Sequence, residues 1–569
     1  MNRNVKIKFE NFSFRYQTLK HPTLKNINLE IYEGEKVLIA GRSGSGKSTI
    51  MHCLNGIIPF FLEGEISGKL TLNMTAPHNR RNIFEASKKV GTILQDQDSQ
   101  FVGLSVGEDT AFLMENDAVP EKIMKRKVEK SLHIVNMKEF ISYSPYELSD
   151  GQKQRVSIAG ILTSQAEIFV FDEPLGNLDP KAKKDTLKLL DKISKTTGKT
   201  IIIVEHQIEE ILEFNPDRII IIEDGKILAA DTPSNILISG ILGQVGLREP
   251  LYIEAVRNAQ IDFSKIENAH IVESFATQGI REKFLKNIEH RIRRFDHTGE
   301  IILSVKGLSH NFVPEKKVLD NISFDINKGE IVSILGNNGA GKSTLSFLIA
   351  GFIPCKEGEI FLSKDNITNT TITQRGTKIG LIMQSPNRMI VKNIVKDEVS
   401  LGLKISKLGT RYIEQKTEES LRICGLWEYR NWPISALSYG QKKRVTIASI
   451  LAHDPKVIIL DEPTAGQDFR TYTLFMDFIK TLAKTGIAII LITHNMQLAL
   501  EYSTRSIVIS NGVKIADGPP VKVFSDKDII TTACLRESSL YSLAEALNID
   551  KQVFIEFFLE QIKFGRGVK

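Results

Sequence analysis

The sequence predicts an α/β protein made of two similar phosphate-binding domains in one chain. A glycine-rich stretch, GRSGSGKST at residues 41–49, recurs as GNNGAGKST at residues 336–344. An apolar run followed by two acids, IFVFDEP at residues 168–174, recurs as VIILDEP at residues 457–463. Because both motifs return about 290 residues later, we expect two homologous units.

The chain is too long for a single hydrophobic core. Its 569 residues lead us to expect about two to four domains. A hydrophobic content of 42% with 25% charged residues is ordinary for a globular protein and excludes a largely disordered chain. The net charge of +6 is spread along the chain, whereas a nucleic-acid interface concentrates basic residues on one face. We therefore expect no nucleic-acid partner.

Neither metal-binding cysteines nor a membrane span is indicated. The four cysteines, Cys53, Cys355, Cys424 and Cys534, stand alone without a CxxC spacing, which fits a reducing cytoplasm. No apolar run approaches the roughly 20 residues that cross a bilayer. The first ten residues alternate like a strand and lack the apolar core of a signal peptide. We expect any membrane role to be peripheral.

The glycine-rich stretches are predicted to bind phosphate. The pattern GxxxxGK[ST] follows an apolar strand, KVLIA at residues 36–40, and precedes a helix. Its glycines let backbone N–H groups surround phosphates at a helix N-terminus. Lys47 would bring positive charge to the outer phosphates, and Ser48 would offer its hydroxyl to magnesium. The residues expected to line the two loops are Gly41, Ser43, Gly44, Gly46, Lys47, Ser48, Thr49, Gly336, Asn338, Gly339, Gly341, Lys342, Ser343 and Thr344.

Side chains at two strand ends are predicted to catalyse hydrolysis. Asp172 ends an apolar strand, where its carboxylate can hold magnesium directly or through water. Glu173 beside it is placed to orient or deprotonate the attacking water. His206 ends a second buried strand, IIIV, and can contact a γ-phosphate, although a lone histidine is more often structural. The equivalent residues of the second unit are Asp461, Glu462 and His494.

These motifs make each unit resemble the nucleotide-binding domain of ABC ATPases, over nearly the whole chain. The stretches LSDGQKQR at residues 148–155 and LSYGQKKR at residues 437–444 resemble the signature of that family. The resemblance implies two P-loop NTPase domains in one chain. Each is expected to have a RecA-like core, an antiparallel β subdomain and a helical signature subdomain.

The resemblance also implies two composite ATP sites, each shared between the halves. The signature of one half caps the ATP on the phosphate loop of the other, so Ser149 would face the ATP of Lys342. By the same pairing, Ser438 would face the ATP of Lys47. A covalent tandem replaces a bimolecular encounter with an effective concentration of about millimolar. The signature residues expected to contact ATP are Ser149, Gly151, Gln152, Ser438, Gly440 and Gln441.

Each unit supplies one residue for every further role that the family assigns. The pairs are Tyr16 and Phe312 on adenine, Gln95 and Gln384 in the Q-loop, Asp179 and Asp468 in the D-loop, and His206 and His494 as switch histidines. The magnesium ligands implied are Ser48, Gln95, Asp172, Ser343, Gln384 and Asp461. ATP and Mg²⁺ are therefore the expected cofactors. The Q-loop glutamines would also contact the membrane partner.

The two halves are similar but not identical. We expect a first ATPase domain at 1–240, a linker and C-terminal extension at 241–300, a second ATPase domain at 301–530 and a helical extension at 531–569. Asp150 and Tyr439 replace the glycine usual at the third position of the signature, and the D-loops read GNLD and AGQD. Because the lysine, glutamate and histidine are present in both halves, we expect two competent sites.

Within the family, the chain most resembles the ATPases of energy-coupling-factor importers. The stretch GTILQDQDSQFVGLSVGEDTAF at residues 91–112 is similar to the Q-loop of that group. LREPLY at 247–252 and LRESSLY at 535–541 are similar to its C-terminal extension. The resemblance implies uptake of a thiamine-type precursor or a metal cation. It implies a transmembrane scaffold subunit, a small membrane substrate-binding subunit, no direct contact with the solute and a place on the cytoplasmic face of the cell membrane.

Three other classes remain as alternatives. A tandem sugar-importer ATPase has a similar length, but its second unit commonly loses catalytic residues, whereas Glu462 is present. An ABC-class translation factor usually ends its signature in Glu, where this chain has Gln152 and Gln441, and carries a long charged helical linker. A DNA-repair ATPase of the class would need zinc cysteines or long coiled coils. Neither is evident in the sequence.

Overall fold

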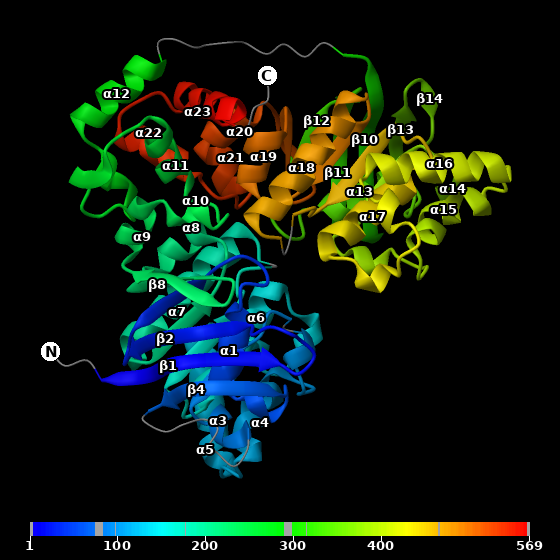
Figure 1. Cartoon of the computed structure of the whole chain (residues 1–569). Helices are drawn as coiled ribbons and strands as arrows, with labels where there is room; N and C mark the ends of the chain where they lie inside the picture. Colours follow the sequence, from blue (N-terminus) through cyan, green and yellow to red (C-terminus); the bar gives the residue numbers. More distant parts are fainter. Residues whose placement is uncertain are drawn as a thin grey trace. The chain divides into compact units, whose positions relative to one another are not determined.

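The computed structural model describes residues 4–73, 83–96, 98–176, 178–288, 299–314, 316–464 and 467–565. Its internal contacts divide the chain into two compact units, Met1–Ile280 and Arg281–Lys569. The boundary falls inside the segment 241–300 that was expected to link the domains, and residues 289–298 of that segment lie outside the described residues. Figure 1 shows the elements of both units.

A six-stranded sheet forms the centre of the first unit. Its strand order is β5-β6-β7-β3-β8-β9, in which β9 is antiparallel to β8 and the other neighbours are parallel. The middle strands β3 and β7 are buried at every position, because a parallel sheet is covered on both faces and favours continuous apolar runs. The strands are β3 (Lys36–Ala40), β5 (Val90–Ile93), β6 (Ile168–Asp172), β7 (Thr200–Val204), β8 (Arg218–Glu223) and β9 (Lys226–Asp231).

A three-stranded antiparallel sheet packs on this core. Its order is β2-β1-β4, with β1 (Val5–Tyr16), β2 (Leu24–Tyr32) and β4 (Gly64–Leu72). Apolar side chains alternate along β1, and Ile7, Phe9 and Phe14 join one buried cluster with residues of the central sheet. Because apolar and polar residues alternate along each strand, only one face of this sheet has to be covered, and the other can face solvent.

Helices complete the first unit. The signature subdomain contains α4 (Val106–Asn116), α5 (Glu121–Ile134) and α6 (Asp150–Thr163), which pack on one another. Ser105 starts α4 with a capping box to Glu108. The other helices are α1 (Lys47–Asn55), α2 (Ile57–Phe60), α3 (Ile83–Ser87), α7 (Pro180–Thr197), α8 (Ile208–Ile211), α9 (Pro233–Ser239), α10 (Ile241–Gln244) and α11 (Leu251–Asn258), with α12 (Gln278–Ile288) crossing the boundary.

The second unit repeats the architecture of the first. Its central sheet has the order β15-β16-β17-β12-β18-β19 and its antiparallel sheet the order β11-β10-β13-β14. The strands are β10 (Ile301–Val313), β11 (Lys316–Asn327), β12 (Ile331–Leu335), β13 (Glu357–Leu362), β14 (Asp365–Asn366), β15 (Ile379–Ile382), β16 (Val457–Asp461), β17 (Ala488–Ile492), β18 (Arg505–Ser510) and β19 (Val513–Gly518). The predicted fold class, two α/β units with antiparallel subdomains, is confirmed.

The helices of the second unit match those of the first. They are α13 (Lys342–Ala350), α14 (Ile372–Gly376), α15 (Val395–Ile405), α16 (Thr410–Ile423), α17 (Tyr439–Leu451), α18 (Phe469–Lys484), α19 (Met496–Tyr502), α20 (Pro520–Ser525), α21 (Lys527–Thr532), α22 (Ser539–Ala546) and α23 (Lys551–Gly565). Phe284 of α12 packs against Phe554 of α23 with ring centroids 5.0 Å apart. Part of the segment 241–300, expected as a linker and C-terminal extension, thus joins the core of this unit.

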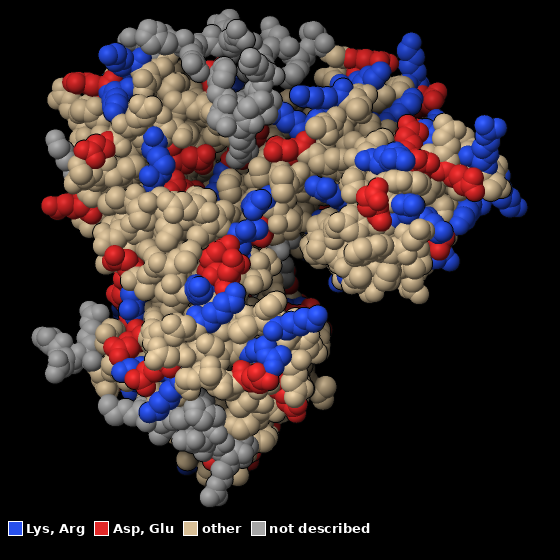
Figure 2. All heavy atoms as spheres, in the orientation of Figure 1, with Lys and Arg blue, Asp and Glu red and all other residues tan. Residues whose placement is uncertain are grey.

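Surface and helix properties agree with the composition. On the face drawn in Figure 2, Lys and Arg side chains are interspersed with Asp and Glu rather than gathered in one basic field. Within the described residues, no helix combines the length and apolar character that crossing a bilayer requires.

Candidate active site

The first phosphate loop lies between β3 and α1. Gly46, the residue before the helix, has φ 107°, and a Cβ there would lie 2.9 Å from Leu24 Cδ2. Glycine is therefore required for both conformation and space. Lys47 is only 6% exposed, and its Nζ donates to the carbonyl oxygens of Gly41 and Arg42, each at 2.8 Å. The loop curls around its own lysine.

The second loop, between β12 and α13, has the same geometry. Lys342 Nζ donates to Gly336 O at 2.7 Å and to Asn337 O at 2.8 Å. Gly341 has φ 100°, and a Cβ there would lie 2.6 Å from Leu319 Cδ2. The other expected loop residues lie along these two loops or in the first turns of α1 and α13: Ser43, Gly44, Ser48, Thr49, Asn338, Gly339, Ser343 and Thr344.

Both predicted general bases sit in a strained backbone position directly after a strand. Glu173 and Glu462 each have φ 44°, which is unusual for a residue with a side chain. Their amides donate to Val204 O and Ile492 O, both at 2.9 Å, which fixes each turn against the neighbouring strand. Such strain persists where surrounding structure holds it, and it is often found at functional sites.

The acids beside them have the chemistry of magnesium ligands. Burial, followed by the charge of Glu173, raises the pKa of Asp172 to about 6, and Lys47 opposes this rise. Asp461 is raised to about 6 for the same reasons, with Glu462 and Lys342 in the equivalent places. A buried carboxylate held next to a second one favours a hard cation such as Mg²⁺. The oxygen donors present therefore fit Mg²⁺.

The two glutamates have different hydrogen-bond partners. Gln95 Nε2 donates to Glu173 Oε2 at 2.8 Å, and His206 Nδ1 lies 3.4 Å from Glu173 Oε1. The loop that carries Gln95, the end of β6 and the loop after β7 that carries His206 thus meet at this carboxylate. Burial acts to raise the pKa of Glu173, but His206 and Lys47 hold it below its usual value.

Glu462 is instead held by the loop after β17, which carries Thr493 and His494. Its Oε1 accepts from the backbone amide of His494 at 3.0 Å, and His494 Nδ1 lies 2.7 Å from the same oxygen. Thr493 Oγ1 donates to Oε2 at 3.1 Å. Burial opposes the effect, but the charge and hydrogen bond of His494 lower the pKa of Glu462. Sequence reasoning missed Thr493, although the aligned stretches IIIVEHQ and IILITHN differ at this position.

Both signature serines start a helix, as the sequence predicted. Ser149 is the N-cap of α6 in a capping box with Gln152, and Ser438 is the N-cap of α17 in a capping box with Gln441. Each helix thus presents free backbone N–H groups at a position that suits an anion. Gly151 and Gly440 lie in the first turns of these helices.

The signature and the phosphate loop of one unit lie on different subdomains. In the first unit α6 packs mainly against α4 and α5, with smaller contacts to β5 and α7, whereas α1 packs against β5, β6 and β7. The D-loop aspartates, Asp179 and Asp468, cap α7 and α18 by accepting from backbone amides at 2.8 Å. Of the D-loop residues, 177 and 465–466 lie outside the described residues.

The third residue of each signature faces its own Q-loop. Tyr439 OH donates to Gln384 O at 3.1 Å. In the first unit the next basic residue makes the link: Lys153 Nζ donates to Asp98 Oδ1 at 2.7 Å. Asp150 lines a small cavity of about 50 Å³ beside Gln95 and Glu173, and burial raises the pKa of Asp150. These links were not evident from sequence.

The predicted adenine residues differ between the units. Tyr16 OH lies 3.1 Å from Thr49 Oγ1, which places the ring beside the first turn of α1. Phe312 is 66% exposed and stacks edge-on against His310 at 4.8 Å between centroids. An exposed aromatic ring is suited to stacking on a base.

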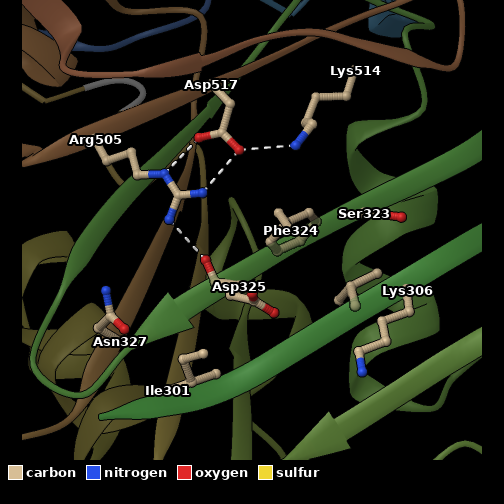
Figure 3. A pocket seen from close by; sticks show the side chains of 10 residues that line it. Ile301, Lys306, Ser323, Phe324, Asp325, Asn327, Arg505, Lys514 and Asp517 are labelled. Carbon is tan, nitrogen blue, oxygen red and sulfur yellow. Dashed lines mark hydrogen bonds and ion pairs between the residues drawn. The ribbon is translucent and has the colours of Figure 1, made fainter. Parts of the chain in front are cut away.

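A groove of about 510 Å³ in the second unit contains none of the predicted site residues (Figure 3). Three of its charged side chains are paired with one another: Arg505 donates to Asp517, and Lys514 donates to Asp517; Arg505 also donates to the backbone oxygen of Asp325. The groups that would recognise a ligand are therefore engaged in holding β19 against β11.

Comparison with known proteins identifies the family. An ABC transporter family matches residues 24–176 and 319–465, and a family described as ATP-binding cassette cobalt transporter matches residues 239–310. An ABC transporter ATP-binding protein of Clostridium perfringens (strain 13 / Type A) is 46% identical over 572 residues, covering 100% of both chains. One of Vibrio vulnificus (strain CMCP6) is 45% identical over 573 residues, covering 98% of both.

A solved structure is also similar. It is cbiO1 from Clostridium perfringens, described as part of the ABC transporter complex cbiONQ, with 34% identity over 43% of this chain and 99% of that chain and a TM-score of 0.39. The full-length relatives and the two family matches agree with the duplicated fold and with the phosphate loops described above. The chain therefore belongs to the ABC transporter ATP-binding proteins, as an ATPase with two ABC domains in tandem.

Proposed function

We propose that the chain is the energy-coupling subunit of an importer of the energy-coupling-factor type. One observation carries this proposal: residues 239–310, outside the general ABC domains, match the family described as ATP-binding cassette cobalt transporter. That match supports the metal-cation alternative over a vitamin precursor. The importer's membrane subunits, a scaffold and a small substrate-binding protein, would hold the chain at the cytoplasmic face.

Each ATP site is proposed to work through the side chains already described. Lys47 and the N–H groups of its loop bind the phosphates, and Tyr16 stacks on adenine. Asp172, Ser48 and Gln95 would hold Mg²⁺, which when bound neutralises charge on the β- and γ-phosphates. Glu173 orients and deprotonates the attacking water, while His206 contacts the γ-phosphate. The second unit would use the equivalent residues.

Purification of the complex from native membranes tests the assignment. We expect mass spectrometry to identify a polytopic membrane protein and a second, smaller membrane protein bound to the chain. We also expect uptake of radioactive Co²⁺ to fall in cells that lack the chain and to return on complementation. Co-purification with ribosomes would favour the translation-factor alternative, and a loss of sugar uptake would favour the sugar-importer alternative.

We predict that acidic residues after the Q-loop glutamine contribute to docking on the membrane scaffold. Asp96 and Asp98 are both exposed, and Asp98 forms an ion pair with Lys153 of the signature helix α6. Replacing both aspartates with Asn should weaken assembly at moderate salt and leave nucleotide binding unchanged, because surface ion pairs with partner arginines are lost. Co-purification yield against salt concentration measures this.

Two matched variants separate docking from the internal ion pair. Lys153→Gln breaks the contact with Asp98 but keeps both negative charges, so assembly should persist. Glu121→Gln removes an exposed acid on α5 and should have no effect. An Asp96→Asn, Asp98→Asn chain that co-purifies with its partners as well as the unmodified chain does would refute the docking role.

A further inference from the structure

The two switch loops differ at the residue before the histidine. Glu205 precedes His206 in the first unit, and Thr493 precedes His494 in the second. Both side chains are fully buried, with 0% exposure. A carboxylate and a hydroxyl place very different charges at equivalent positions next to a catalytic histidine. The two ATP sites are therefore not electrostatically equivalent.

Thr493, itself uncharged, completes a hydrogen-bond network around Glu462. Its Oγ1 donates to Glu462 Oε2 and accepts from the amide of Asn495 at 3.0 Å. The hydroxyl uses both its donor and its acceptor capacity, so nothing at this position is left unsatisfied. In the second unit Glu462 is the only acid in contact with His494 Nδ1 among the described residues.

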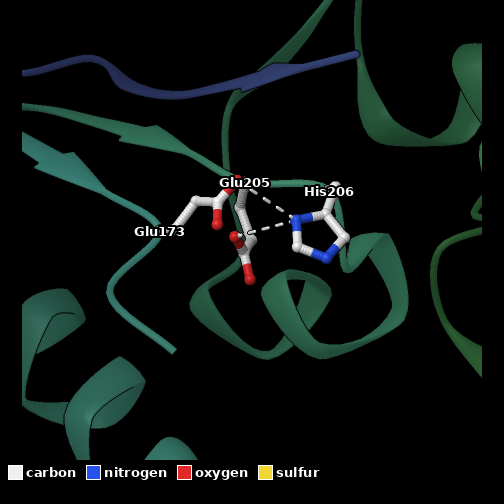
Figure 4. Close-up of side chains that lie close together, drawn as sticks. All are labelled: Glu173, Glu205 and His206. Carbon is white, nitrogen blue, oxygen red and sulfur yellow. Dashed lines mark ion pairs between the residues drawn. The ribbon is translucent and has the colours of Figure 1, made fainter. Parts of the chain in front are cut away.

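Glu205 has no such network. Among the described residues, neither of its carboxylate oxygens accepts a hydrogen bond. Figure 4 shows two acids approaching the same ring nitrogen of His206: Nδ1 lies 3.7 Å from Glu205 Oε2 and 3.4 Å from Glu173 Oε1. A buried carboxylate without hydrogen bonds is costly, so a nearby positive charge must compensate it.

The surroundings of Glu205 leave His206 as that charge. Besides His206 and Glu173, the charged groups that face Glu205 are Lys183 of α7 and Glu210 of α8. Lys183 Nζ already pairs with Glu210 Oε2 at 2.8 Å. Burial raises the pKa of Glu205 to about 7, while His206 lowers it. Burial lowers the pKa of His206, but Glu205 and Glu173 together raise it above its usual value.

We propose that Glu205 is a positioning residue of the first ATP site, which keeps His206 protonated and its Nε2–H directed to a phosphate oxygen. The proposal rests on the role of His206 given above. A protonated histidine adds positive charge where the γ-phosphate carries negative charge. The second site lacks this device, because Thr493 carries no charge.

A metal ion at the same place is disfavoured. The ligand atoms of Glu173, Glu205 and His206 lie within 4.8 Å of one another, a spacing that a cation can bridge. Glu173 is already held by Gln95, and the ammonium of Lys47 acts on both Glu173 and His206. A fixed positive charge so close opposes a divalent cation; it also opposes the protonation of His206, but there Glu205 and Glu173 outweigh it. The proton on His206 supplies the positive charge that compensates the buried carboxylate of Glu205.

Histidine NMR on the full, nucleotide-free chain tests the charge coupling directly. The His206 signal is assigned as the one lost in His206→Gln. In Glu205→Gln, which keeps the shape and removes the charge, the pKa of His206 should fall by about one unit or more, a tenfold change in its protonation constant. In Glu205→Asp, which keeps the negative charge, the pKa of His206 should stay close to that of the unmodified chain. An unchanged pKa of His206 in Glu205→Gln overturns the proposal, whatever the hydrolytic role of the site.

Turnover provides the second test. In a Glu462→Gln background, which silences the second site, hydrolysis is measured from about pH 6 to about pH 9. The charged form of His206 exists below its pKa and is lost as the pH rises through it. Glu205→Gln and Glu205→Thr should therefore shift the alkaline loss of activity to lower pH by about one unit, and Glu205→Asp should not.

The outcomes distinguish the proposal from the function on which it rests. A shifted histidine pKa with no turnover in any Glu462→Gln chain would overturn the hydrolytic assignment and leave the Glu205–His206 coupling standing. A uniform loss of rate with an unchanged pH profile would mean that Glu205 is only structural. As a matched control, Glu210→Gln alters a carboxylate that Lys183 already neutralises and should change the profile less.

Discussion

Glu173→Gln combined with Glu462→Gln is expected to reduce ATP hydrolysis by roughly 100- to 10,000-fold, because this is the cost of losing a general base. Both glutamates directly follow the aspartate that we propose as a magnesium ligand, and both sit in the same strained turn. Glutamine keeps the size and most hydrogen bonds, so the turn and the phosphate loops should remain. Steady-state phosphate release and equilibrium ATP binding measure the two properties separately.

Single variants and a control make this result specific. Glu173→Gln and Glu462→Gln alone should each leave one working site, because the two carboxylates have separate partners. Glu139→Gln changes an exposed acid that is not among the predicted site residues, and this variant should hydrolyse ATP at the rate of the unmodified chain. Near-normal hydrolysis in the double variant, with ATP still bound, would show that neither glutamate is the general base.

The second prediction concerns which residues share one ATP. Lys47 and Ser438 are expected to serve one nucleotide, and Lys342 and Ser149 the other. In the first unit the signature helix packs mainly on α4 and α5 and the helix after the phosphate loop packs on the central sheet, and we expect each signature to face the loop of the other half. Residues that act on one site are non-additive, since a second removal damages a site already lost.

A double-mutant cycle on trapped nucleotide decides the pairing. Lys47→Ala with Ser438→Arg should resemble the worse single variant and roughly halve the nucleotide trapped. Lys47→Ala with Ser149→Arg should instead damage both sites and abolish trapping. In the Glu173→Gln, Glu462→Gln background, trapped nucleotide reports the closure of the two halves on ATP without ATP hydrolysis. Coupling of Lys47 to Ser149 rather than to Ser438 would make each half a self-contained ATPase.

Local features of the site could be predicted from the sequence because they depend on short spacings. A phosphate loop needs glycines at fixed positions between a strand and a helix, and Gly46 and Gly341 have the left-handed conformations that this demands. The serine before each signature helix caps it through a glutamine three residues later, again a local interaction. Duplication of these motifs predicted the duplicated fold.

Contacts between distant residues could not be predicted in this way. Gln95 and Glu173 are 78 residues apart, and Lys153 and Asp98 are 55 apart, so nothing in local spacing pairs them. Within residues 241–300, which the sequence predicts to be a linker and C-terminal extension, Phe284 packs against Phe554 of the second unit, a contact that no local pattern indicates. Such contacts depend on how subdomains fold back on one another.

The sequence by itself determined the chemistry of the phosphate loops, the strand-end acids and the signature helices. The tertiary structure decided the electrostatic surroundings of each predicted general base. Glu205 and Thr493 are visible in the aligned stretches, but only burial beside a histidine and a second carboxylate turns their difference into an electrostatic one. Desolvation and nearby charge set a pKa, and both arise from residues that meet only in the folded chain.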